Sequence, residues 1–323
     1  MTLRCAVLDD YQDAAMAMAD WSRLAGRVEV AVFHEHITRE DALVEALHDF
    51  DIIVAMRERT PFRAALLARL PRLRLLVTTG MRNASIDVQA AIDNGVTVCG
   101  TASQSEPAVE LTWALLLGLA RHLVVESNAM RAGGPWQSTI GADLAGRTLG
   151  LIGLGKIGGK VARIGAAFGM DVVAWSQNLT AERAEAAGAR LAASKEELLA
   201  GSDFVSVHVV LSERTRGLLD AAALRLMRPT AYLINTSRAP IVDRSALIEA
   251  LEQGWIAGAG LDVFDIEPLP ADDPLRRLPY VLATPHIGYV TRANYERAFG
   301  EAIEDIEAFL DGAPIRELRP SSG

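Results

Sequence analysis

The 323-residue chain has only two cysteines, Cys5 and Cys99, and they lie far apart in separate strand-like segments. A disulfide framework needs several cysteines, and a structural zinc site needs ligand pairs at short spacing, so both kinds of cross-linked small protein are excluded. We expect two buried thiols, no bound metal, and a location in the reducing cytoplasm.

Long apolar runs are also missing from the sequence. The most apolar segment, residues 109–120, is followed directly by Arg121 and His122. A membrane-spanning helix needs about 20 consecutive apolar residues. This segment therefore predicts a helix buried inside the protein, and we expect no membrane as a partner.

Positive charge is scarce as well. Lysine and arginine number 32 against 41 aspartates and glutamates, which gives a net charge of −9, and the acidic residues are spread along the chain. Proteins that bind nucleic acid usually carry a basic face, so nucleic acid is not an expected partner. A small anionic ligand is still compatible with this composition, because it needs only a local positive site.

One dense glycine pattern is present, Gly153-Leu154-Gly155-Lys156-Ile157-Gly158. The apolar residues 148–152 before it are typical of a buried parallel strand, and apolar residues after it recur at helical spacing. Between a strand and a helix, the first glycine permits a tight turn, the second lets a diphosphate approach the backbone, and the third lets helix and strand pack closely. A chance cluster of glycines would lack these flanks, so the pattern predicts a dinucleotide-binding unit.

Strand-like and helix-like segments alternate along the whole chain, which predicts an α/β protein with two doubly wound parallel-sheet domains. We expect strands at residues 3–8, 28–33, 52–56, 73–78 and 96–99, then at 148–152, 170–175, 204–208, 231–235, 259–262 and 281–283. The expected helices include 11–21, one opened by a capping box at Thr38 and Asp41, 107–122 and 291–310.

Polar stretches directly follow three of the predicted strands in the second domain. They are residues 235–240, 261–268 and 284–288. Ligands of open α/β sheets collect beyond the carboxyl ends of the strands, so these stretches are candidates for a site. Taken singly, each has an ordinary interpretation: a solvated arginine, a glutamate at a turn before proline, and a histidine that serves as a structural donor.

Together with the glycine pattern, these stretches closely resemble the D-isomer-specific 2-hydroxyacid dehydrogenase family, which includes glyoxylate, hydroxypyruvate and phosphoglycerate dehydrogenases. The resemblance covers nearly the full chain, and its motifs are residues 153–158, 205–208, 215–218, 235–243, 260–268 and 284–288. It implies a flavodoxin-like substrate domain formed by residues 1–103 and 290–323, and a Rossmann-type nucleotide domain formed by residues 104–289. It also implies hydride transfer between NAD(P)H and a small 2-keto acid to give a D-2-hydroxy acid, in a homodimer whose active site lies in the cleft between the domains.

The family's catalytic residues fall on Arg238, Glu267 and His286. A guanidinium can grip the carboxylate of a 2-keto acid and polarise its carbonyl group. As the hydride arrives, a protonated imidazole can donate to the carbonyl oxygen, and a carboxylate at the other ring nitrogen favours the charged imidazole. His208 falls near the cofactor in this resemblance and is not the expected proton donor.

The resemblance also implies contacts to the cofactor. The amides of Lys156 and Ile157 would meet the diphosphate, Thr236 and Ser237 the nicotinamide ribose, and Asp262 the carboxamide, although a strand-end cap is the ordinary interpretation of Asp262. The full expected set is Gly153, Gly155, Lys156, Ile157, Gly158, Ser176, Val209 near the adenosine, Thr236, Ser237, Asp262 and Gly288.

Ser176 departs from the family pattern, because an acidic residue usually binds the adenosine ribose hydroxyls at the end of the second strand. Losing that carboxylate removes repulsion against a 2′-phosphate, but Gln177 and Asn178 follow rather than an arginine that would bind one. The sequence favours NAD as the cofactor and leaves NADP possible.

The substrate contacts implied by the resemblance come from the first domain, at Gly80, Met81 and Arg82. Backbone amides of this loop would meet the substrate carboxylate. Arg82 replaces a glycine and either adds a second positive contact or points to solvent. Trp136 either reaches the active site of a partner subunit or is a plain core or interface residue.

A non-enzymatic function also fits part of this pattern. An NAD(H)-sensing, corepressor-like binding protein would keep the nucleotide site without turnover. Formate dehydrogenase is a further relative within the enzymes, but it carries glutamine where this chain has Glu267. The sequence favours a dehydrogenase and does not identify which 2-hydroxy acid is its substrate.

Overall fold

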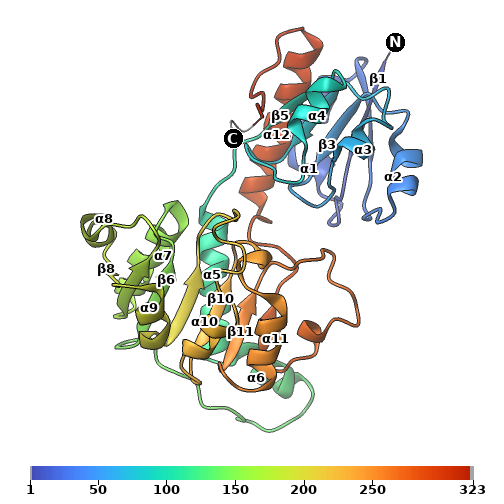
Figure 1. Cartoon of the computed structure of the whole chain (residues 1–323). Helices are drawn as coiled ribbons and strands as arrows, with labels where there is room; N and C mark the ends of the chain where they lie inside the picture. Colours follow the sequence, from blue (N-terminus) through green and yellow to red (C-terminus); the bar gives the residue numbers. More distant parts are fainter. Residues whose placement is uncertain (1, 321–323) are drawn as a thin grey trace. The chain divides into compact units, whose positions relative to one another are not determined.

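The structure is a computed structural model that describes residues 2–320. The chain divides into two compact units, one formed by the residues up to Gln104 together with those from Val290 onward, the other by Ser105–Tyr289. Each unit is an α/β structure built on its own parallel sheet (Figure 1).

The first unit contains, among the described residues, a sheet of five strands. The strands are β1 (Leu3–Val7), β2 (Val28–Val32), β3 (Ile52–Ala55), β4 (Leu75–Thr78) and β5 (Thr97–Gly100). They pair in parallel in the order β2-β1-β3-β4-β5, which is the flavodoxin-like order. The order reverses direction between β1 and β3, so the carboxyl ends of these two strands flank the position where such sheets bind ligands.

Helices cover both faces of this sheet (Figure 1). On one face, α2 (Glu40–Leu47), α3 (Ala64–Leu67) and α4 (Val88–Asp93) bury apolar side chains against the strands. The remaining helices are α1 (Ala15–Met18), the 3-10 turn η1 (Trp21–Leu24) and α12 (Arg292–Leu310), and they contact one another. Phe299 of α12 is fully buried with its ring 6.2 Å from that of Trp21, and α12 also contacts β4. This packing explains why the last helix of the chain belongs to the first unit.

The second unit contains, within the described part of the chain, a sheet of seven strands. They are β6 (Thr148–Ile152), β7 (Asp171–Trp175), β8 (Arg190–Leu191), β9 (Phe204–Val207), β10 (Tyr232–Asn235), β11 (Gly258–Leu261) and β12 (Val281–Ala283). All pair in parallel in the order β12-β11-β10-β9-β6-β7-β8. The chain first builds outward from β6 to β8 and then in the other direction from β9 to β12, as in a Rossmann fold.

The helices of the second unit also lie in two layers (Figure 1). One layer contains α5 (Glu106–Ala120) and α7 (Lys156–Ala167), and the other α9 (Lys195–Gly201), α10 (Ala221–Leu226) and α11 (Arg244–Glu252). The remaining elements are α6 (Leu123–Arg131), α8 (Ala181–Ala186), η2 (Ala239–Ile241) and η3 (Pro274–Arg276). Because both faces are covered, the strands are continuous apolar runs rather than alternating ones.

The predicted fold class is confirmed: both sheets are parallel and doubly wound. Residues 109–120 form most of α5 and are largely buried, as predicted. Within residues 2–320 no single helix is long and apolar enough to cross a bilayer; α5 and α6 meet that criterion only when joined, and the pair bends by 65°.

Two local predictions are wrong. The helix expected over residues 11–21 is reduced to α1, because the Asp10 carboxylate accepts the amides of Ala14 and Ala15 and so caps the chain only at that point. The capping box at Thr38 and Asp41 does not form, since α2 begins at Glu40 with Arg39 as its N-cap and no side-chain cap bond. Local hydrogen bonds from a side chain to nearby backbone amides thus compete with a longer helix at residues 11–21.

Candidate active site

In the second unit, the predicted site residues follow the carboxyl ends of neighbouring strands. Arg238 follows β10, Glu267 follows β11 and His286 follows β12, and these three strands are adjacent in the sheet. The glycine pattern follows β6 and Val209 follows β9, which are the two strands at the point where the sheet order reverses. Because all the strands are parallel, these ends share one edge of the sheet.

The three glycines between β6 and α7 differ in what surrounds them. Gly153 has φ +99°, a conformation open to glycine, and a Cβ there would lie 2.7 Å from the carbonyl oxygen of His208. A Cβ at Gly158 would collide with the carbonyl oxygen of Gly153, whereas one at Gly155 would meet nothing within 4 Å. The turn is therefore tight on its inner side and open at Gly155, directly before the first amides of α7. A diphosphate fits this cradle because those amides lack partners within the helix.

His208 lies beneath this turn, at the end of β9. Its Nε2 is 2.9 Å from Oγ of Ser206, and burial lowers the pKa of the imidazole to about 4. The ring is therefore neutral near neutral pH, which agrees with the expectation that His208 is not the proton donor.

Hydrogen bonds fix the turn after β10, which carries Arg238. Asn235, nearly fully buried, accepts the amide of Ser237 at 3.0 Å and donates from Nδ2 to the carbonyl of Arg238 at 3.1 Å. The Ser237 hydroxyl donates to the carbonyl of Val209 at 2.7 Å, and Thr236 Oγ1 lies 2.7 Å from Thr112 Oγ1. These side chains tie β9, β10 and α5 together at the predicted ribose contacts.

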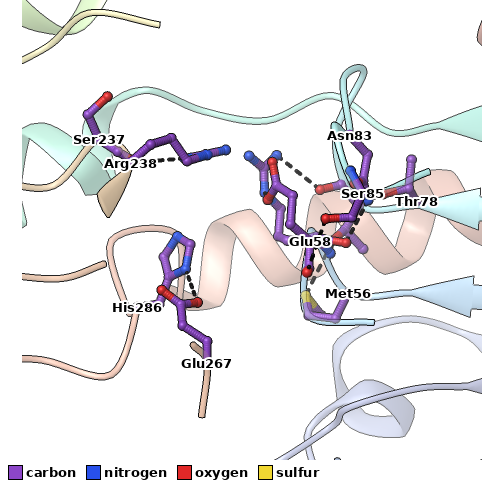
Figure 2. Close-up of polar contacts among 11 residues, drawn as sticks. Met56, Glu58, Thr78, Asn83, Ser85, Ser237, Arg238, Glu267 and His286 are labelled. Carbon is purple, nitrogen blue, oxygen red and sulfur yellow. Dashed lines mark hydrogen bonds and ion pairs between the residues drawn. The ribbon is translucent and has the colours of Figure 1, made fainter. Parts of the chain in front are cut away.

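Arg238 has an extended backbone and donates from Nη1 to the carbonyl of Ser237 at 2.8 Å. Figure 2 shows the long side chain leaving the turn after β10. The guanidinium carries five N–H donors in a planar fork, the geometry that binds a carboxylate with two parallel hydrogen bonds.

Asp262, directly after β11, is buried and organises the turn that carries His286. Its Oδ1 accepts the hydroxyl of Thr284 at 2.7 Å and the amide of Ile287 at 2.8 Å, and its Oδ2 accepts the amide of Gly288 at 2.8 Å. Burial raises the pKa of this carboxyl group above its ordinary value, while the three bonds act in the opposite direction. The contact predicted between Asp262 and a carboxamide stays a prediction. The three hydrogen bonds show that Asp262 also positions the turn that carries His286, which the sequence did not indicate.

His286 and Glu267 form a hydrogen-bonded pair. Nδ1 of the imidazole lies 2.6 Å from Oε2 of Glu267, and Figure 2 shows the two side chains facing each other. Oε1 of the glutamate accepts the amide of Phe264 at 2.9 Å, and the ring of Tyr289 meets the imidazole edge-on at 5.3 Å. His286 itself has φ +51°, which is uncommon for a residue with a Cβ and is held here by the Asp262 bonds on either side of it. The pair directs Nε2 of the ring away from Glu267.

Ser176 follows β7 and is half-buried, while Gln177 and Asn178 beside it are exposed. The carbonyl of Ser176 accepts the amide of Leu179 at 3.0 Å, so these residues form a turn before α8. No carboxylate directly follows β7. The side chains at this predicted adenosine contact, which would distinguish NAD from NADP, are therefore polar and uncharged.

The predicted substrate loop, Gly80-Met81-Arg82, belongs to the first unit. Gly80 is buried with φ +145°, while Met81 and Arg82 are exposed. Arg57, which was not among the predicted site residues, follows β3 and donates from Nη1 to the carbonyl of Thr79 at 3.2 Å. The signal was available, since Met56-Arg57-Glu58-Arg59 places charges directly after a buried strand, but only the strand order brings that end beside the loop after β4.

Trp136 and its surroundings lie in an ordered segment without regular secondary structure. Glu126 of α6 accepts hydrogen bonds from Ser138 and from Thr139 Oγ1, the latter at 2.6 Å, and Ala142 donates to the carbonyl of Ala120 at 2.7 Å. The Trp136 side chain is 82% exposed in the single chain, so it is not a core residue.

Comparison with known proteins identifies related sequences and structures. The family model described as the NAD binding domain of D-isomer specific 2-hydroxyacid dehydrogenase matches residues 113–288. A glyoxylate reductase of Aeropyrum pernix is 40% identical over 76% of each chain, and a D-3-phosphoglycerate dehydrogenase of Bacillus subtilis is 35% identical over 84% of this chain and 51% of its own length. A crystal structure described as phosphoglycerate oxidoreductase from Vibrio cholerae superposes with a TM-score of 0.92 at 37% identity, covering 97% of this chain and 100% of the other.

Proposed function

The chain belongs to the D-isomer-specific 2-hydroxyacid dehydrogenase family and is an NAD(P)-dependent enzyme, and we propose that it reduces a small 2-keto acid to the D-2-hydroxy acid with His286 as the proton donor. The observation that carries this proposal is the 2.6 Å hydrogen bond between His286 Nδ1 and Glu267 Oε2. It orients the ring and leaves Nε2 for the oxygen of the substrate. A relative named glyoxylate reductase supports a small substrate.

Glu267 acts on the proton donor rather than on the substrate. Its charge stabilises the imidazolium form, and its second oxygen is held by the amide of Phe264, so the carboxylate keeps its orientation through the reaction. In the direction of reduction the imidazolium gives its Nε2 proton to the forming alkoxide. In the direction of oxidation the neutral ring takes that proton back.

Arg238 supplies the fixed positive charge of the site. Its Nη1 donates to the carbonyl of Ser237, and a guanidinium is suited to bind both a carboxylate and the polarised carbonyl oxygen. A donor that already points at the oxygen lowers the cost of the charge that develops there during hydride transfer.

The dinucleotide would be held by the turn from Gly153 to Gly158, with the amides of Lys156 and Ile157 at the diphosphate. Thr236 and Ser237 would contact the ribose beside the nicotinamide, and Val209 and Ser176 the adenosine half. When bound, the nicotinamide supplies or accepts the hydride. We propose NAD as the physiological cofactor, because no basic side chain follows Ser176 to bind a 2′-phosphate.

The enzyme is further proposed to act as a homodimer. Large apolar side chains are exposed along α6 and the segment after it, and monomeric proteins rarely expose such a group together. They are Leu123, Val124, Val125, Met130, Trp136 and Ile140. The bonds of Glu126 hold this segment in one conformation, which suits it to pack against a second copy.

The proposed reaction is tested by following NADH and NADPH oxidation with glyoxylate, hydroxypyruvate, pyruvate and phenylpyruvate. We expect turnover with at least one of these acids and a product of D configuration. NADH binding without oxidation by any 2-keto acid would contradict the proposal and favour a nucleotide-sensing binding protein. A tenfold or greater preference for NADPH in kcat/KM would overturn the choice of cofactor.

A further inference from the structure

Two charged residues of the first unit, Arg57 and Glu58, lie beside the predicted substrate loop. They follow the carboxyl end of β3, which is adjacent in the sheet to β4, the strand that leads into Gly80. Ser85, just after that loop, has its Oγ 3.5 Å from the carbonyl of Glu58, and Figure 2 shows the two residues together. Residues distant in the sequence thus form one polar surface.

The backbone at Arg57 is fixed by the substrate loop itself. The amide of Arg57 donates to Thr79 Oγ1 at 2.9 Å, and its carbonyl accepts Asn83 Nδ2 at 2.6 Å. Arg57 has φ +51°, a left-handed conformation that costs free energy for a residue with a Cβ. The two hydrogen bonds to Thr79 and Asn83 hold this conformation, so the fold sets the direction of the Arg57 side chain.

That side chain lies directly over Gly80. Nη1 donates to the carbonyl of Thr79 at 3.2 Å, and a Cβ built on Gly80 would overlap Nη1. The inference rests on the proposed function, in which backbone amides of this loop hold the carboxylate of the 2-keto acid. A substrate bound there lies within a few ångströms of the guanidinium.

Glu58 compensates the charge of this arginine. Its Oε2 lies 3.5 Å from Nε of Arg57, and the two side chains are only 18% and 19% exposed. The neighbouring Arg59 is used differently, since its guanidinium lies 4.3 Å from the centre of the Tyr11 ring and donates to the carbonyl of Asp9. The half-buried pair beside Gly80 is therefore close to neutral overall, and its partial burial limits screening by solvent.

We propose that Glu58 is a specificity-determining residue that selects 2-keto acids with a single negative charge and excludes those with a second carboxylate or a phosphate. Arg57 alone would attract a second anionic group to the substrate loop. Glu58 cancels that attraction and repels a second anion directly. The preferred side chain of the substrate is uncharged.

The test compares two substrates of the same shape, oxaloacetate and 4-methyl-2-oxopentanoate, which differ in carrying a carboxylate or an isopropyl group. We expect the wild-type enzyme to favour the singly charged acid in kcat/KM. Glu58→Gln should raise the ratio of kcat/KM for oxaloacetate to that for 4-methyl-2-oxopentanoate by about tenfold or more, since it unmasks one positive charge in a half-buried site. Arg57→Gln should lower the same ratio.

Charge-preserving and remote variants serve as controls. Glu58→Asp should keep the wild-type ratio, and Glu45→Gln, an exposed substitution on α2, should not change it. The effect of Glu58→Gln should shrink at 1 M salt, where charges are screened within about 3 Å. A ratio that Glu58→Gln leaves unchanged, or a wild-type preference for oxaloacetate, would overturn the role of Glu58 while the proposed reaction stands. A wild-type enzyme that reduces no 2-keto acid would overturn both.

Discussion

Three buried or half-buried carboxylates contact groups of the proposed site, and their individual roles differ. Glu267 accepts from His286 and Phe264, Asp262 holds both flanks of His286, and Glu58 pairs with Arg57. Only the first was assigned a role in catalysis from the sequence. A carboxylate with bound N–H donors keeps its position, so Glu267 and Asp262 can each orient a neighbour in the site, whereas Glu58 acts on Arg57 through its charge.

At the residue scale, the first prediction concerns the proton donor. His286→Ala should lower kcat by about 10²- to 10⁴-fold, the usual contribution of a general acid, while the Kd for NADH stays close to that of the wild type. Glu267→Gln should cause a smaller loss, because glutamine can keep the hydrogen bond to Nδ1 but not the charge. Steady-state kinetics and fluorescence titration with NADH measure the two effects.

His48→Ala is the matched control, because that histidine is exposed at the end of α2 in the first unit. It should leave kcat unchanged. Turnover of His286→Ala within about threefold of the wild type would rule out His286 as the general acid, since such a group contributes at least about 10²-fold.

At the scale of single elements, the turn between β6 and α7 shows how a short sequence defines a local structure. The pattern predicts strand, turn and helix, and the structure contains all three at the expected positions. Neighbouring atoms add a constraint that the pattern does not contain. A Cβ at Gly153 would be too close to the carbonyl of His208, which follows β9, and a Cβ at Gly158 would collide with the carbonyl of Gly153. The element is thus defined locally and tightened by a neighbouring strand.

The adjacent glycines Gly158 and Gly159 provide a matched test of this turn. Gly158→Ala should weaken NADH binding by at least about tenfold, because its Cβ has no space beside the carbonyl of Gly153 and the turn must move. Gly159→Ala should leave binding intact, since its Cβ would meet only Ala187 at 4.0 Å, an ordinary contact. The test compares the Kd for NADH of the two variants, and thermal unfolding checks that both variants are folded. Equal affinity in both variants would show that the turn tolerates the displacement.

At the scale of the whole molecule, the chain crosses between its units at residues 104–105 and 289–290. The final helix returns to the first unit because its apolar face, including Tyr295, Phe299 and Ile303, is buried there. The second unit carries the exposed apolar group around α6, which no other described part of the chain covers. Assembly of two copies would remove this surface from water.

Light scattering after gel filtration tests the assembly. We expect a mass of two chains of 34.7 kDa each, and dissociation to one chain when Trp136 and Ile140 are both replaced by Asp, because burying two unpaired charges in an apolar interface is costly. Ile92→Asp, at an exposed isoleucine of α4, should not change the mass. A wild-type protein that is monomeric at micromolar concentration would refute the dimer.

The sequence by itself determined the features that depend on neighbouring residues. These are the alternation of strands and helices, the glycine turn and the polar stretches at strand ends, because turns, periodicity and chain direction are local properties. The resemblance to a family then named Arg238, Glu267 and His286, and the structure brings them to adjacent strand ends of one sheet. The sequence pattern failed for the helix at 11–21, where the nearby Asp10 carboxylate caps the chain only at Ala14 and Ala15, and for the cap at Thr38, where the helix begins at Glu40.

Tertiary structure alone decided which distant residues meet. The bonds of Asp262 to the turn after β12, the carbonyl of His208 beneath Gly153, and the guanidinium of Arg57 over Gly80 all join segments that follow different strands. Such contacts depend on strand order and register, which set the neighbours of each strand end and leave no local trace in the sequence. The sequence therefore indicated the reaction, and the packing of β3 beside β4 suggests which substrates it accepts.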